Sequence, residues 1–92
     1  MIAVNIELVG TLQRRLGKKR LTVNLDEPRT VLMLAQRLSI IKPSIVASID
    51  EEMIDPSILI LVNGKEISIL NGLNTILENG ALVTFVPVSH GG

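Results

Sequence analysis

The strongest constraint on the fold lies in residues 1–41, where two strand patterns are followed directly by one helical pattern. Apolar residues alternate with polar or small ones in Ile2–Leu8 and again in Leu21–Leu25, and this is the period of a half-buried strand. The connection between them is short enough for an antiparallel hairpin, and Leu12 and Leu16 within it suit one short helical turn. The helix that follows needs a sheet across which it can lie.

The helical pattern has recognisable ends. Apolar residues recur at helical spacing from Val31 to Ile41, and Thr30 is placed to cap the first turn. Pro43 ends the helix, because proline disfavours helical geometry in the residue before it. Residues 43–57 could form a short second helix, with Ile45, Val46, Ile49 and Met53 on one face.

The second half of the chain contains strand signals separated by turns. Ile58–Val62 is apolar on both faces and reads as a central strand, and the Asn63-Gly64 pair after it is a strong turn signal. Lys65–Ile69 is predicted as a short edge strand, and Ala81–Val86 as the closing strand. Between them, two apolar residues are predicted to fill the core, Ile76 and Leu77.

These elements predict an α+β fold in which the first and last strands pair in parallel at the centre. This is the β-grasp (ubiquitin-like) arrangement, a mixed four- to five-stranded sheet with one main helix packed across it. We expect one domain over residues 1–87 and a flexible Gly-Gly tail over residues 88–92.

Composition excludes several classes of function. Nine basic residues balance nine acidic ones among 92, so no net positive charge favours binding to nucleic acid. The only aromatic residue is Phe85, so the chain also lacks a set of aromatic side chains on which bases could stack. The chain has no cysteine, and hence no disulfide framework, thiolate nucleophile or cysteine zinc site. Without a signal peptide or a long apolar run, we expect no membrane association and a cytoplasmic location.

The last residues combine a strand, a proline and two glycines. Pro87 cannot donate to a sheet ladder and so marks the end of strand pairing, while Val88–Gly92 can reach roughly 16 Å when extended. The terminal carboxylate is ionised near neutral pH, and as a nucleophile toward the α-phosphate of ATP it would give an acyl-adenylate. The alternative is that the terminal glycines are simply a frayed end.

The closing stretch resembles the end of the MoaD/ThiS-like sulfur-carrier proteins, which include archaeal small modifiers and ubiquitin-related modifiers. Six residues fall at the family's spacing without a gap: Gly80, Val83, Phe85, Pro87, Gly91 and Gly92. Leu61–Gly64 is similar to the family's internal strand and turn. The chain departs from the pattern at Ala81, where an acidic residue is usual, and at Val88, where a second proline is usual.

The resemblance implies that an adenylyltransferase of the ubiquitin-activating type would use ATP to adenylate Gly92, and that a sulfur donor would convert this carboxylate to a thiocarboxylate. The sulfur would pass to a molybdopterin precursor with the large subunit of molybdopterin synthase, or to a tRNA base with a tRNA thiolation enzyme. Some archaeal relatives also join the same carboxylate to protein lysines. The chain would then be a carrier or a small non-catalytic subunit, monomeric alone and without a stably bound cofactor.

The remaining candidates have less specific signals. His90 has no nucleophile partner, so we interpret it with Gly91 as part of a tail that threads into the activating enzyme. The acidic residues of 50–55 lack the spacing of a calcium loop, and we expect a solvated face and no metal site. Residues 14–20 contain a basic cluster, for which a solvated turn is a better interpretation than orientation of an acidic partner or RNA.

The closing strand is apolar on both faces, which predicts one buried face and one partly exposed apolar patch for a partner. We assign the partner-binding surface to Phe85, Val83, Pro87 and Val88. Phe85 itself fits either the core or the open face of the sheet. Two hypotheses remain: a sulfur carrier or modifier that acts through Gly92, and a β-grasp interaction module that does not use its C-terminus.

Overall fold

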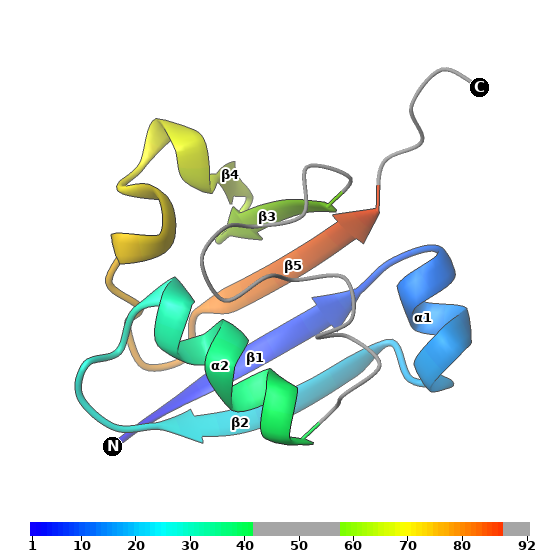
Figure 1. Cartoon of the computed structure of the whole chain (residues 1–92), viewed down its shortest axis with the longest axis horizontal. Helices are drawn as coiled ribbons and strands as arrows, with labels where there is room; N and C mark the ends of the chain where they lie inside the picture. Colours follow the sequence, from blue (N-terminus) through cyan, green and yellow to red (C-terminus); the bar gives the residue numbers. More distant parts are fainter. Residues whose placement is uncertain (42–57, 88–92) are drawn as a thin grey trace.

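The computed structural model describes residues 1–41 and 58–87, and the possible second helix in 43–57 and the tail 88–92 lie outside these residues. The elements in chain order are β1 (Ile2–Leu8), α1 (Thr11–Leu16), β2 (Arg20–Leu25), α2 (Val31–Ile41), β3 (Ile58–Val62), β4 (Lys65–Glu66), the 3-10 helices η1 (Ile67–Ile69) and η2 (Gly72–Asn74), and β5 (Leu82–Pro87). Figure 1 shows α2 crossing one face of the sheet.

The sheet has five strands in the order β2-β1-β5-β3-β4. β1 pairs antiparallel with β2 and parallel with β5, and β5 pairs antiparallel with β3. β5 is therefore flanked on both sides, although it is the last strand of the chain. The topology confirms the predicted β-grasp fold, including the parallel pairing of the first and last strands.

The core lies between α2 and the sheet face beneath it. Val31, Leu34 and Leu38 follow one another at helical spacing, and all three side chains are completely buried. The other side chains that are buried to this degree come mainly from alternate strand positions: Val4, Ile6, Leu8, Ile60, Leu77, Val83 and Phe85. The period-two pattern of the sequence thus identifies the strand face that α2 covers.

The turn after β3 forms as predicted, but the edge strand beyond it is shorter. Asn63 and Gly64 both have positive φ angles, 51° and 86°, as a two-residue hairpin turn of type I′ requires. Only Lys65 and Glu66 then pair with β3, and the chain enters η1 at Ile67. The Glu66 carboxylate accepts a hydrogen bond from the Ser68 N–H at 2.7 Å, and this local bond competes with further strand pairing.

The prediction that Ile76 fills the core is wrong. Its side chain is 52% exposed, whereas that of Leu77 is completely buried. Both residues lie in an extended segment beside the start of α2, where Thr30 and Ile76 form an isolated bridge and the Leu77 N–H donates to the Arg29 carbonyl at 2.7 Å. Successive side chains of extended backbone point to opposite sides, so only one of the two can face the core.

Thr30 caps α2 as predicted. Its Oγ1 accepts a hydrogen bond from the Met33 N–H at 3.1 Å, and its carbonyl accepts the Leu34 N–H at 3.0 Å. We expect Thr30→Ala to lower the free energy of unfolding by about 1 kcal/mol, because it removes the acceptor for one N–H of the first turn. Urea denaturation measures this loss, and Thr30→Ser, which keeps the hydroxyl, is the control. Equal losses in the two variants would contradict the capping role.

Candidate functional site

The site is built on the end of β5, where the chain leaves the sheet. β5 pairs with β1 as far as Leu8 opposite Phe85, and with β3 as far as Ile58 opposite Pro87. The Val9 N–H also donates to the Phe85 carbonyl, at 3.3 Å. Pro87 is the last residue of β5 and is partly buried. Because it pairs with Ile58 of β3, the five residues after it start from a fixed point at the end of the sheet.

The short helix α1 lies beside this exit point (Figure 1). Gly10, which precedes α1, has φ 61° and ψ −128°, a backbone conformation that essentially only glycine adopts. A Cβ atom added to Gly10 would stand 3.5 Å from Cγ of Pro87. Gly10 therefore makes the sharp bend that brings α1 alongside the end of β5.

The structure corrects part of the predicted partner surface. Phe85 and Val83 are both completely buried, so neither side chain lies on an exposed surface. Leu8 and Ile60 flank Phe85 in the register, and these three residues face the core beneath α2. Of the two positions considered for Phe85, the core is correct. Pro87 stays partly exposed, and Val88 lies outside the described residues together with His90, Gly91 and Gly92.

The opposite face of the sheet carries the partly exposed apolar patch that the sequence predicts. We call Leu59, Leu61, Leu82 and Val86 the open-face patch. Leu59 pairs with Val86, and its side chain is 38% exposed; the other three are partly buried. The patch lies on β3 and β5, so it is continuous with the exit of the tail. An apolar surface in this position suits a protein partner that also receives the tail.

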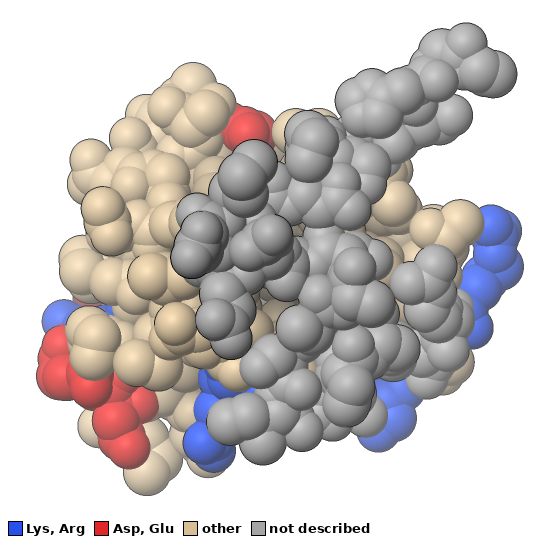
Figure 2. All heavy atoms as spheres, viewed as in Figure 1, with Lys and Arg blue, Asp and Glu red and all other residues tan. Residues whose placement is uncertain are grey.

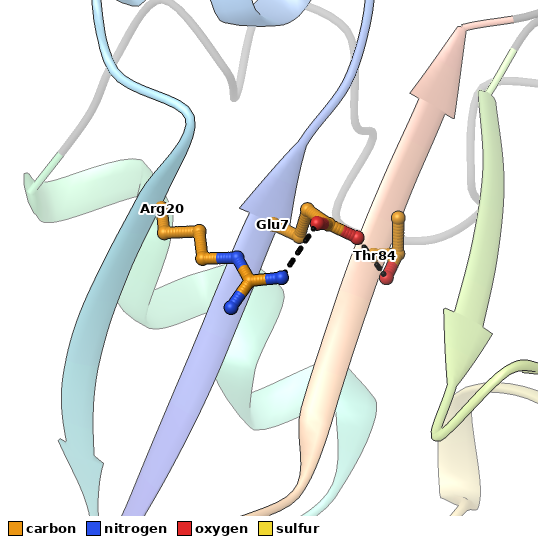
Figure 3. Close-up of polar contacts among 3 residues, drawn as sticks. All are labelled: Glu7, Arg20 and Thr84. Atoms are coloured by element: carbon orange, nitrogen blue, oxygen red, sulfur yellow. Dashed lines mark hydrogen bonds and ion pairs between the residues drawn. The ribbon is translucent and has the colours of Figure 1, made fainter.

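A row of polar side chains borders the patch on the same face (Figure 3). The Arg20 Nη2 donates to Glu7 Oε2 at 3.1 Å, with the two side chains 65% and 20% exposed. Thr84 Oγ1 donates to the other oxygen of Glu7, Oε1, at 3.4 Å, and Thr84 is buried. Sequence reasoning missed this row, because only the register places Glu7 between Arg20 and Thr84.

The predicted basic cluster lies at the same end of the molecule as α1. Arg14, Lys18, Lys19 and Arg20 are exposed, and Figure 2 shows basic side chains at the edge where α1 lies, whereas acidic and basic side chains lie together at the far end. Arg20 is the member that turns onto the open face through its ion pair with Glu7. The acidic residues of 50–55 lie outside the described residues. No helix in the described part of the chain is long and apolar enough to cross a membrane.

Fold and site together define a ubiquitin-like β-grasp protein of the sulfur-carrier and modifier class, and comparison with known proteins bears this out. The profile of Urm1 (Ubiquitin related modifier) matches residues 3–92. The chain belongs to the Urm1 family. The predicted resemblance to the sulfur carriers and ubiquitin-related modifiers is therefore confirmed at the level of the family.

Individual relatives agree with the family match. Ubiquitin-related modifier 1 of Saccharomyces cerevisiae is 29% identical over 99 residues, covering 100% of each chain. The solution structure of small archaeal modifier protein 1 from Methanosarcina acetivorans is 27% identical, with a TM-score of 0.85 over 100% of this chain and 98% of that one. The crystal structure of the Amycolatopsis orientalis BexX/CysO complex contains a chain with the same fold, at 21% identity and a TM-score of 0.75 over 97% of this chain and 99% of that one.

Proposed function

We propose that the chain acts through the carboxylate of Gly92, which an adenylyltransferase of the ubiquitin-activating type activates with ATP. The single observation that carries the proposal is the position of β5. It is held between β1 and β3, and it delivers the last five residues from the edge of an apolar patch. The family match, which extends to residue 92, supports the same use of the tail.

The proposed chemistry consists of two displacements. A carboxylate oxygen of Gly92 bonds to the α-phosphorus of ATP, pyrophosphate leaves, and an acyl-adenylate forms. Hydrosulfide supplied by a sulfur donor then attacks the acyl carbon, AMP leaves and a thiocarboxylate forms, which passes its sulfur to a molybdopterin precursor or a tRNA base. A lysine amine that displaces AMP instead would give an isopeptide bond. In this scheme the chain contributes a substrate group and no catalytic side chain, and ATP belongs to the activating enzyme.

We assign recognition by the activating enzyme to the open-face patch, with Gly91 and His90 threading toward the ATP site. The patch is apolar and adjoins the exit of the tail, so one partner can cover the patch and receive Gly92 together. The BexX/CysO complex, in which a protein of this fold is assembled with another protein, supports a protein partner.

Leu59→Glu tests the patch. We expect the KM of the chain in ATP–pyrophosphate exchange, measured with the activating enzyme of the same organism, to rise about 10-fold or more, because a carboxylate would be buried in an apolar contact. Ile69→Glu is the matched control, since Ile69 is 72% exposed and lies in η1, away from the patch. Equal KM values for the two variants would contradict docking on the open face.

The alternative function is an interaction module that binds through the same sheet face and never uses its carboxylate. The open-face patch is compatible with it. The two functions differ in ATP–pyrophosphate exchange, because only the carrier or modifier supports exchange that depends on its own C-terminal residue. An exchange rate that is the same with and without the chain would favour the interaction module.

A further inference from the structure

A small hollow lies on the open face of the sheet, next to the open-face patch. Its volume is about 300 Å³, and the residues that line it are Asn5, Arg20, Leu21, Thr22 and Leu82. Leu82 belongs to both the hollow and the patch, so the two form one continuous surface. A partner that covers the patch would therefore also close the hollow.

Hydrogen bonds fix the polar side of the hollow. Thr22 Oγ1 donates to Asn5 Oδ1 at 3.0 Å, and Asn5 Nδ2 donates to the Gly80 carbonyl at 3.4 Å. The amide oxygen of Asn5 is thus engaged as an acceptor. Its nitrogen carries two hydrogens, and the bond to Gly80 uses one of them. The side of the hollow formed by Asn5 can therefore offer a donor to a ligand.

Arg20 adds a positive charge to the same hollow. Its Nη2 bonds to Glu7, but a guanidinium has five N–H donors, and the side chain is 65% exposed. Residues 11–20 contain five basic side chains and no acidic one, and Glu7, the partner of Arg20, is the negative charge beside the hollow. The hollow therefore combines donors and a cation with an apolar wall from Leu82, while Leu21 packs its side chain against the core on the other face of the sheet.

We propose that this hollow binds an acidic side chain, Asp or Glu, of the protein that docks on the open-face patch. A carboxylate fits the lining, since it accepts hydrogen bonds from both the Arg20 guanidinium and the Asn5 amide. A protein is a better source than RNA, because the neighbouring surface is aliphatic and the only aromatic side chain, Phe85, is buried and provides no platform for bases. The proposal rests on the docking part of the proposed function and not on the chemistry of Gly92.

The test is an NMR titration of the isotopically labelled chain with three capped amino acids: glutamate, glutamine and lysine. We expect capped glutamate to shift the side-chain signals of Asn5 and Arg20 with a dissociation constant on the order of 10 mM, because one exposed ion pair contributes little. Capped glutamine and capped lysine should leave these signals in place. Binding of lysine or glutamine at least as tight as that of glutamate would overturn the proposal, and so would the absence of any shift.

Two variants should change the dissociation constant of capped glutamate in opposite directions. Arg20→Gln should raise the dissociation constant of capped glutamate about 3-fold or more, since it removes the cation from an exposed pair. Glu7→Gln should lower it about 2-fold, since it frees Arg20 and removes a nearby negative charge. Lys65→Gln, which removes one exposed positive charge on β4, is the control and should change nothing. If Arg20→Gln and Lys65→Gln raised the dissociation constant equally, binding would depend only on the overall charge of the protein, and this would contradict a specific site at the hollow.

A further titration separates a protein partner from RNA. Capped tetraglutamate and an RNA tetranucleotide carry similar charge, and the proposal predicts that the peptide binds the hollow more tightly. Tighter binding of the RNA would assign the hollow to phosphate and overturn the proposal. None of these titrations needs an activating enzyme or ATP. The proposal for the hollow can therefore be wrong while Gly92 is still adenylated. Equally, the hollow can bind glutamate even if Gly92 is not adenylated.

Discussion

Deletion of Gly92 is expected to reduce adenylation of the chain by about 1000-fold or more, while the free energy of unfolding stays the same. The shortened tail would end about 3.3 Å earlier, and a misplacement of about 1 Å already costs on the order of 100-fold in rate. Stability should not change, because the core side chains of the described residues come from positions 2–85 and Gly92 follows β5 in the sequence. ATP–pyrophosphate exchange and urea denaturation measure the two quantities.

His90→Ala is the matched control within the tail. It leaves the length of the tail and the carboxylate in place, so its effect should be limited to the loss of one contact with the activating enzyme, seen as a KM change of about 10-fold or less. If the chain without Gly92 is adenylated as fast as the full chain, the proposed function is wrong and the interaction module is the better account.

Phe85→Ala is expected to lower the free energy of unfolding by about 3–5 kcal/mol, because Phe85 is completely buried between β1 and β3 beneath α2. This is a large part of the roughly 5–15 kcal/mol that stabilises a natural domain. Val86→Ala, at the next position on the same strand but partly exposed, should cost less than about 1.5 kcal/mol. Chemical denaturation of both variants measures the contrast.

Substitutions at Val86 and Phe85 should affect binding to the activating enzyme in the reverse order of their effects on stability. Val86 belongs to the open-face patch and Phe85 does not, so Val86→Ala should raise the KM for adenylation more than Phe85→Leu does, with both proteins folded. Phe85→Leu keeps the buried position filled and tests the point even if Phe85→Ala does not fold. A stable Phe85→Ala protein with a raised KM would mean that Phe85 anchors a partner, which would contradict its position in the core.

The main elements of the fold could be predicted because each has its own periodicity. The alternation in Ile2–Leu8, the helical spacing from Val31 and the Asn63-Gly64 turn each specify a local structure, and the structure contains all three. The two errors in the predicted fold lie where local hydrogen bonds determine the backbone conformation. Ser68 bonds to the Glu66 side chain and ends the edge strand early, and the bridge between Thr30 and Ile76 leaves Ile76 exposed.

The candidate site could be predicted only in part. β5 is apolar on both faces, so its pattern cannot show which face meets α2. The sequence therefore predicts a partner surface that includes Phe85 and Val83, whereas the structure buries both and leaves Leu82 and Val86 partly exposed. The contact between Glu7 and Thr84 joins residues 77 positions apart, and it depends on the parallel register of β1 and β5. No pattern within either strand encodes that register.

Intact-protein mass spectrometry tests the central claim most directly. After incubation with its activating enzyme, ATP and a sulfur source, the chain should gain the mass difference between sulfur and oxygen. Oxidation of any of the three methionines adds nearly the same mass, so fragmentation must locate the change at Gly92. An alkylating agent should also label the thiocarboxylate. A mass change confined to Gly92, and lost in the chain without it, is the predicted result; an unmodified Gly92 with an activating enzyme that adenylates its other substrates would contradict the account.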